Sequence, residues 1–186
     1  MIVPYAEGLL HDRVVPSITR QGYSPTLIRC VNTVGHPDSY PMILRQYLLG
    51  EEDVVIVEHD NESRPGFLAS YEECPEPWCF HAYDFGPQTW EQAIEEGRPD
   101  SAPMGSGFAA LGHTRFRAGF CEPIRSTLES DFFARSWVSR DTFVAGALNL
   151  LGFSSHRHEG KSVHHHPYED GTHPYQQQVK GEHRRP

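Results

Sequence analysis

The chain has 186 residues, a formal net charge of −9 and 38% hydrophobic residues. This length suits one domain with a single core. The acidic balance argues against nucleic acid or an anionic membrane as the main partner, because both bind basic surfaces. No apolar stretch approaches the roughly 20 residues that span a bilayer. Met1 leads directly into a strand-like run, so we expect no signal peptide and a cytoplasmic location.

The first half of the chain predicts a β-α-β-α-β order. Strands are expected at residues 2–5, 26–31 and 53–60. A short helix, kinked by Pro16, is expected within residues 9–20, and a second helix over residues 39–49, stopped by Gly50. This order implies parallel strands joined by right-handed crossovers, and so an α/β fold with a mostly parallel sheet flanked by helices.

The second half is less regular. It predicts a short helix at 65–73, a strand at 78–83, an irregular insertion at 84–107, a buried strand at 108–112 and a weak helix at 114–128. The best helix spans residues 137–151, with Trp137, Val144, Leu148 and Leu151 on one stripe and Gly152 at its end. A last strand is expected at 153–158 and a segment returning towards the sheet at 163–166. We expect one domain over residues 1–167 and a polar tail over 168–186.

The sheet is expected to be organised around the third strand, Asp53 to Asp60. Its unbroken β-branched run is typical of a strand buried on both faces. Glu58 and Asp60 follow at its carboxyl end, where open α/β sheets bind ligands. In an extended backbone the side chains of these two residues would lie on the same side of the strand. Their carboxylate oxygens would then be hard ligands for a divalent cation that holds phosphates. The alternative is an ordinary polar turn after a buried strand.

The four cysteines have no CxxC spacing. The Cys74/Cys79 spacing is longer than that of a usual zinc knuckle. We expect all four to be reduced and mostly buried, in a reducing compartment.

Several short motifs, taken in order, resemble a family of small GT-A-type, family 2-like glycosyltransferases of actinobacteria and their phages. The resemblance covers nearly the whole chain to about His166. It rests on the segments Val3–Gly8, Val57–Asp60, Cys74–Cys79 and Ala110–Phe116, on Trp137 followed by Asp141, and on Val163–His166. It implies a compact GT-A-like, Rossmann-like fold, a nucleotide-diphosphate-sugar donor and a protein or glycan acceptor. For a phage-encoded chain, the expected location is the host cytoplasm.

The resemblance also implies a divalent metal, manganese or magnesium. Residues Glu58 to Asp60 would stand at the acidic metal-binding triplet of GT-A enzymes, with Asp60 as the direct ligand. Glu58 would act through water or on the ribose. A histidine near the C-terminus would complete the metal shell, with His166 preferred over His164. A carboxylate and imidazole set suits manganese among the available metals.

The donor-binding residues implied by the resemblance are spread over the chain. Pro4, Tyr5 and Glu7 would line the nucleobase pocket, and Asp38 would reach the base or ribose. Arg115 would lie near the sugar or the acceptor. An equal alternative for Arg115 is a surface salt bridge.

Asp141 is the candidate general base. It lies on the apolar stripe of the best helix, near its start, and a transfer with inversion needs a carboxylate to take the acceptor hydroxyl's proton. The alternative has equal weight. If Ser139 is the N-cap, Asp141 is a first-turn acid that stabilises the helix dipole.

Two other functions stay open. The first is a zinc-dependent hydrolase, in which Glu58 and Asp60 would join His156, His158, His164 and His166 as ligands. No HExxH or other strong zinc signature accompanies them. The second is a non-catalytic module that binds nucleotide-sugars or glycans on a degenerate transferase fold. The favoured function is a metal-dependent, hexosyltransferase-like enzyme that inverts the sugar.

Overall fold

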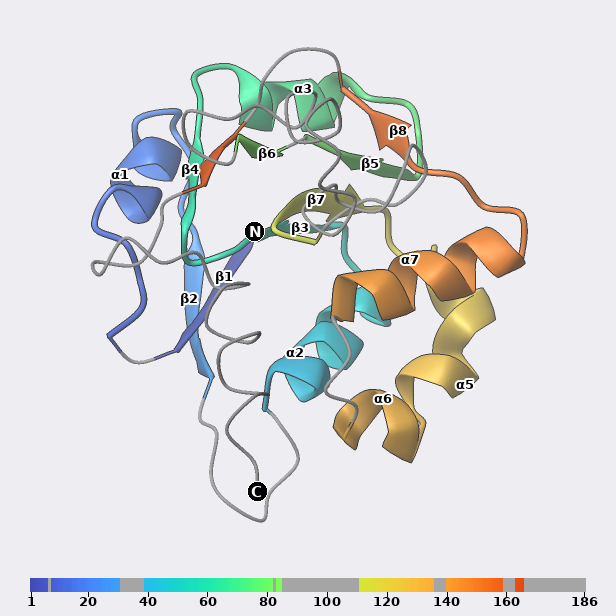
Figure 1. Ribbon diagram of the computed structural model, residues 1–186. Helices are drawn as coiled ribbons and strands as arrows, with labels where there is room; N and C mark the ends of the chain where they lie inside the picture. Colours follow the sequence, from blue (N-terminus) through green and yellow to red (C-terminus); the bar gives the residue numbers. More distant parts are fainter. Residues whose placement is uncertain are drawn as a thin grey trace, which may run out of the picture.

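The computed structural model of the protein describes residues 1–6, 8–30, 39–81, 83–84, 111–135, 140–158 and 163–165 (Figure 1). The predicted site residues Glu7, Asp38 and His166 lie outside the described residues. So do Trp137, most of the insertion, residues 108–110 of a predicted strand, and the C-terminal tail.

The described elements follow the predicted order in the first half of the chain. The strands are β1 (Ile2–Ala6), β2 (Thr26–Cys30), β3 (Val54–Val57), β4 (Asn61–Ser63), β5 (Trp78–Phe80), β6 (Tyr83–Asp84), β7 (His113–Phe116), β8 (His156–Arg157) and β9 (Val163–His165). The helices are α1 (Val14–Thr19), α2 (Ser39–Leu48), α3 (Phe67–Glu73), α5 (Arg125–Leu128), α6 (Asp131–Arg135) and α7 (Arg140–Leu150), with a 3-10 turn at Glu122–Ile124.

Six strands form the main sheet, in the order β2-β1-β3-β7-β5-β8. β1 pairs in parallel with β2 and β3, and β5 pairs in parallel with β8. β7 runs antiparallel to both of its neighbours, β3 and β5. The predicted α/β fold with a mostly parallel, helix-flanked sheet is therefore confirmed, with one antiparallel strand in its middle.

The chain adds strands to the sheet on opposite sides of β1. From β1 the chain passes to β2 on one side, and then returns to β3 on the other. β1 pairs with β2 along five residues, but with β3 only through Ile2 and Ile56. Pro4 has no N–H with which to extend a ladder. Such a reversal point is where open α/β sheets leave a crevice beyond the carboxyl ends of their strands.

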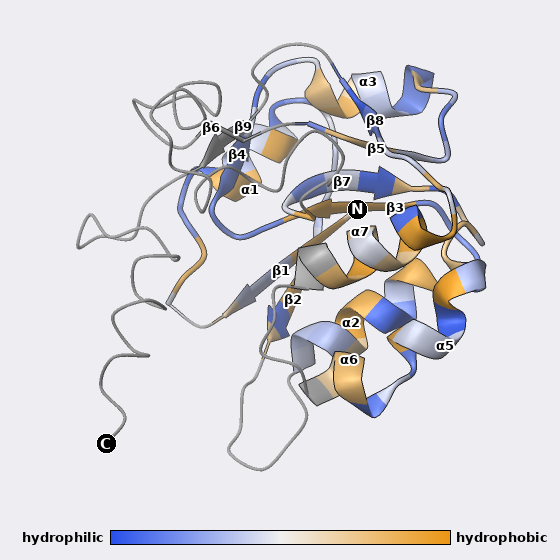
Figure 2. Ribbon diagram, turned by 45° about the vertical axis from the view of Figure 1, so that its right-hand side comes forward, coloured by the Kyte–Doolittle hydropathy of each residue, from blue (hydrophilic) through white to orange (hydrophobic). Residues whose placement is uncertain are grey.

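Helices cover both faces of the sheet (Figures 1 and 2). On one face α2, α5, α6 and α7 pack over Ile2, Val54 and Ile56, together with Trp78 and Phe116. On the other face α1 and α3 pack over Val3 of β1 and Val57 of β3, with Val55 packed against them. β3 therefore contributes side chains to both cores, as its unbroken apolar run predicts. Trp78 of β5 is fully buried in the first of these cores.

A small second sheet has the order β4-β9-β6. β9 pairs antiparallel with β4, with Asn61 opposite His165 and Glu62 opposite His164. The expected return of residues 163–166 thus occurs, but onto this small sheet and not onto the main one.

Several expectations from the sequence are wrong. β3 ends at Val57, and the chain then turns, so Glu58 and Asp60 do not lie on one extended strand. Residues 114–116, expected in a weak helix, belong to the central strand β7. Leu151, expected on the buried stripe of the last helix, is 53% exposed.

No helix within the described ranges is both long and apolar enough to cross a membrane.

Replacing Ile56 by alanine tests the central position of β3. Ile56 is completely buried between strands and helices, so Ile56→Ala should lower the free energy of unfolding by about 2–5 kcal/mol in urea titrations. The control Leu150→Ala, at a side chain that is 90% exposed, should change it by at most about 0.5 kcal/mol. Equal effects of the two substitutions would contradict the packing described here.

Candidate functional site

The turn that follows β3 carries the predicted metal-binding residues. The Asn61 N–H donates to the Glu58 carbonyl at 3.1 Å and closes the turn. The Glu58 N–H donates to the carbonyl of Gly112 at 2.8 Å, and the His59 carbonyl accepts from the N–H of His11 at 2.9 Å. The loops that follow β1 and precede β7 therefore both hold this turn in place.

The acidic side chains of the turn have different surroundings. Asp60 is 6% exposed, and its Oδ1 accepts a 2.9 Å hydrogen bond from Asn61 Nδ2. His59 Nε2 lies 4.0 Å from Asp60 Oδ2. Glu58 is half-buried, and its Oε1 accepts from the hydroxyl of Tyr40 at 2.6 Å. A buried carboxylate needs compensation by hydrogen bonds or by a cation.

These residues fit a hard divalent cation. Asn61 is fully buried, and its Oδ1 has no hydrogen-bond partner among the described residues. A buried acceptor beside a buried carboxylate is a donor set of oxygens, the type that magnesium and manganese prefer. The structure thus brings Asp60 and a second oxygen, from Asn61, to one place. Asn61 is not among the residues that the sequence predicts for the site, although its position directly after Asp60 is a signal for it.

The small sheet brings the histidine segment to this turn. Glu62 and His164 are directly paired, and Asn61 pairs with His165. In the sequence, Asp60 comes directly before Asn61, and His166, which lies outside the described residues, comes directly after His165. The pairing therefore places the backbone of residues 163–165 beside the strand that follows the acidic turn.

Two predicted donor-binding residues lie in β1. Pro4 is buried and Tyr5 is half-buried, near the carboxyl end of the strand. The loop that follows reaches the acidic turn through the bond from His11 to His59. Because Ile2 at the start of β1 pairs with Ile56 near the end of β3, β1 extends past the end of β3, and Pro4 and Tyr5 lie in this extension.

Asp141 lies in the first turn of α7. The structure describes its backbone only. α7 is anchored by Val144, Ala145 and Leu148, which are buried in the core. Its C-terminus is closed by bonds from the N–H groups of Gly152 and Phe153 to the carbonyls of Asn149 and Leu148, as in a Schellman motif, with Gly152 at φ 84°.

Arg115, predicted to lie near the sugar or acceptor, is 3% exposed in the centre of β7. Its guanidinium donates to Cys79 Sγ at 3.4 and 3.2 Å, and to the carbonyls of Cys74 and Glu76. Its Nη1 lies 3.9 Å from Asp53 Oδ2, at the amino end of β3. The alternative reading as a surface residue is therefore wrong.

Two buried imidazoles, those of His113 and His81, pack against α3. His113, opposite Val57, is fully buried, and burial holds its pKa well below the usual value, so the ring is neutral. The hydroxyl of Tyr71 lies 2.6 Å from the His113 carbonyl and 2.7 Å from its Nδ1. The ring of His81 stacks on that of Phe67 at 4.3 Å. The Tyr71 contacts hold α3 against β7, and the stacking of Phe67 on His81 holds α3 against the segment that follows β5.

A second group of potential metal ligands comes from three separate segments. One ligand atom each of Cys74, Cys79 and His158 lies within 4.8 Å of the other two. It is the one such group of three or more among the residues that the structure describes. Burial raises the pKa of the Cys79 thiol to about 12, although the Arg115 guanidinium opposes this shift. All four cysteines are free thiols and three are buried, as expected.

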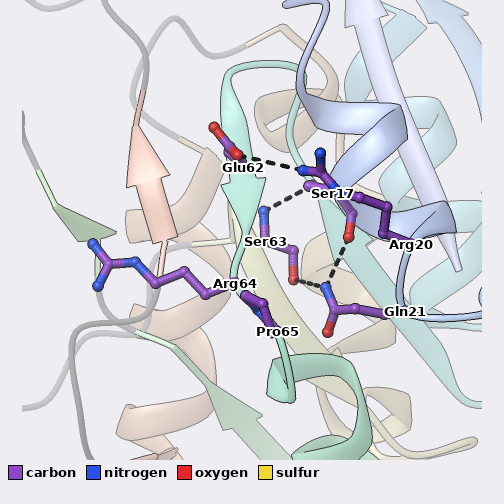
Figure 3. A pocket seen from close by; sticks show the side chains of 7 residues that line it. All are labelled: Ser17, Arg20, Gln21, Glu62, Ser63, Arg64 and Pro65. Atoms are coloured by element: carbon purple, nitrogen blue, oxygen red, sulfur yellow. Dashed lines mark hydrogen bonds and ion pairs between the residues drawn. The ribbon is translucent and has the colours of Figure 1, made fainter.

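A pocket of about 370 Å³ lies between α1 and β4 (Figure 3). The Ser63 N–H donates to Ser17 Oγ at 3.0 Å, and Gln21 Nε2 donates to Ser63 Oγ at 3.1 Å. Arg20 lies 3.7 Å from Glu62. None of the lining residues is among the predicted site residues. The bonds across the pocket attach β4 to α1 and so stabilise the strand that follows the acidic turn.

A scan against models of known protein families and a search of curated proteins find no match to this chain.

Ser17→Ala tests the attachment of β4 to α1. Ser17 Oγ donates to the carbonyl of Val14 and accepts from the Ser63 N–H, which the substitution leaves buried without a partner. The free energy of unfolding should fall by about 1–3 kcal/mol, and hydrogen exchange at the Ser63 amide should accelerate.

The matched control is Ser24→Ala at an exposed position. It should leave both measurements unchanged. An unchanged exchange rate at Ser63 in the Ser17 variant would contradict the role assigned to this bond.

Proposed function

We propose that this protein is a metal-dependent glycosyltransferase of the GT-A type, which transfers a sugar from a nucleotide-diphosphate donor to a protein or glycan acceptor with inversion. The observation that carries the proposal is the pairing of β4 with β9. It brings residues of the acidic turn and of the histidine segment side by side, although about 100 residues separate them in the chain.

The position of the acidic turn supports a nucleotide donor. The turn lies at the carboxyl end of β3, next to the reversal point of the sheet, where ligands of α/β proteins bind. Pro4 and Tyr5 at the end of β1 are the proposed contacts to the base, and Glu58 is the proposed contact to the ribose or to a metal-bound water. Arg115 is left out of the proposed donor site, because its guanidinium donates to Cys79 and to two carbonyls.

The proposed metal site consists of Asp60, the neighbouring amide oxygen of Asn61, and His166 or His164. A bound divalent cation, manganese or magnesium, would neutralise the charge that develops on the diphosphate as it leaves. Asp60 contributes a carboxylate that is already removed from bulk water, which strengthens its interaction with a cation. The bond from Asn61 Nδ2 orients this carboxylate.

Asp141 is the proposed general base. In this role its carboxylate takes the proton of the acceptor hydroxyl as the hydroxyl oxygen attacks the anomeric carbon and the diphosphate departs. Its place in the first turn of a helix anchored in the core gives it a rigid support, which suits a positioned base.

Asp60→Asn tests whether donor binding depends on a metal held by Asp60, in a variant that is expected to stay folded. With a nucleoside diphosphate and manganese at about 100 times Kd, the wild-type melting temperature should rise by roughly 5–10 °C. Asp60→Asn should lose this rise while remaining folded, because the neutral amide is a weaker cation ligand. Differential scanning fluorimetry measures both.

The matched control is Glu52→Gln, an exposed carboxylate just before β3, at the end opposite Asp60. It should keep the full rise. If the wild-type protein shows no rise with uridine, guanosine, adenosine, cytidine or thymidine diphosphate, the proposed function is wrong.

Asp141→Asn tests the base. The variant should keep the thermal shift with nucleotide and manganese, but release nucleoside diphosphate from a reactive donor about 10²–10⁴-fold more slowly. Asp131→Asn, at the exposed first residue of α6, is the control and should keep the wild-type rate. An unchanged rate in Asp141→Asn would assign the carboxylate to stabilisation of the helix dipole instead.

A further inference from the structure

We propose that Cys74, Cys79 and His158 form a zinc-binding site, separate from the acidic turn, that ties an edge strand to the sheet. Cys74 follows α3 directly, Cys79 is the middle residue of β5, and His158 follows β8. These segments meet because β8 pairs in parallel with β5, with Cys79 opposite His156. The His158 N–H also donates to the Phe80 carbonyl at 3.0 Å, which fixes the backbone of the third ligand.

The spacing of the ligand atoms suits a tetrahedral ion. The two sulfur atoms and one imidazole nitrogen all lie within 4.8 Å of one another. At zinc–ligand distances of about 2.0–2.3 Å, ligand atoms at the corners of a tetrahedron are roughly 3.5–4 Å apart. Small side-chain adjustments are therefore enough to close the group around an ion.

The ligand types select a soft or borderline metal. Two cysteine sulfurs and one imidazole are a set that zinc binds well and that magnesium and manganese do not favour. Three protein ligands leave a fourth position for water or a small ligand. This chemistry separates the site from the oxygen ligands of Asp60 and Asn61.

The burial of the group points to a missing partner. Cys74 is 4% exposed and Cys79 is fully buried. The Nε2 atom of His158 is buried and has no hydrogen-bond partner among the described residues. An unpaired buried nitrogen costs free energy unless a ligand satisfies it. A metal ion bound through this nitrogen would satisfy it.

Arg115 supplies the support that a buried thiolate ligand needs. Its guanidinium, 3% exposed, donates to Cys79 Sγ from Nε and Nη2. Its nearest carboxylate in an ion pair is that of Asp53, at 3.9 Å. N–H groups that donate to a ligating sulfur stabilise its negative charge, as outer partners of metal ligands do. A thiolate at Cys79 also compensates the buried positive charge of Arg115.

The consequence for the fold is local. β8 has two residues, both exposed, at the edge of the main sheet. An ion bound to His158, Cys74 and Cys79 links this edge to β5 and to the end of α3. It therefore ties β8 to the rest of the main sheet.

The test uses the full chain, purified with a thiol reductant and loaded with zinc alone. Plasma mass spectrometry after dialysis should give about one zinc per chain. Loading with cobalt instead should give the near-ultraviolet absorption of cobalt–thiolate bonds. Cys79→Ser and His158→Gln should each lower the zinc content at least tenfold. His158→Gln, at a half-buried position, is the variant expected to stay folded, which circular dichroism checks.

The matched control is Cys30→Ser, at a half-buried cysteine in β2, which should keep one zinc. Less than about a tenth of an equivalent of zinc in the wild-type chain, with no cobalt–thiolate band, would overturn the proposal. So would zinc retained in full by a folded His158→Gln variant. A Cys74–Cys79 disulfide, detected as two missing thiols in unfolded protein without metal, would also overturn it.

Discussion

The turn between β3 and β4 is the constraint on which the arrangement of the site depends. It is closed by the bond from the Asn61 N–H to the Glu58 carbonyl, and bonds from the loop after β1 and to the segment before β7 fix it from outside. It positions Asp60 in a nearly buried setting and starts β4, on which β9 pairs. A different turn would change the register of the small sheet and separate the carboxylate from the histidine segment.

The two proposed metal sites differ in chemistry and in position. The acidic turn offers oxygen ligands near the reversal point of the sheet. The group of Cys74, Cys79 and His158 offers sulfur and nitrogen at the far edge of the sheet, and Arg115 lies against it from β7. Because the two ligand sets prefer different ions, each can be loaded without the other.

The sequence predicted the elements whose signals are local. The unbroken β-branched run of β3 and the glycine at the end of α7 correctly predicted their elements, although the strand ends at Val57 and α7 begins at Arg140. β7 was missed because His113, Thr114 and Arg115 are polar, yet all three are buried in a central strand. Their partners are distant in sequence, so no periodicity reveals them. The Cys–His group was missed for the same reason, although the prolines between Cys74 and Cys79 predict a tight loop that brings the sulfurs together.

The most direct test of the central claim is paramagnetic broadening by manganese. Histidine-labelled protein is titrated with substoichiometric Mn²⁺ in the presence of a nucleoside diphosphate, and the imidazole resonances are assigned with single His→Gln variants. The account predicts that the resonance of His164 or His166 disappears first, while that of His156, in the main sheet, persists. Persistence of the His164 and His166 resonances, or simultaneous loss of all imidazole resonances, would contradict it.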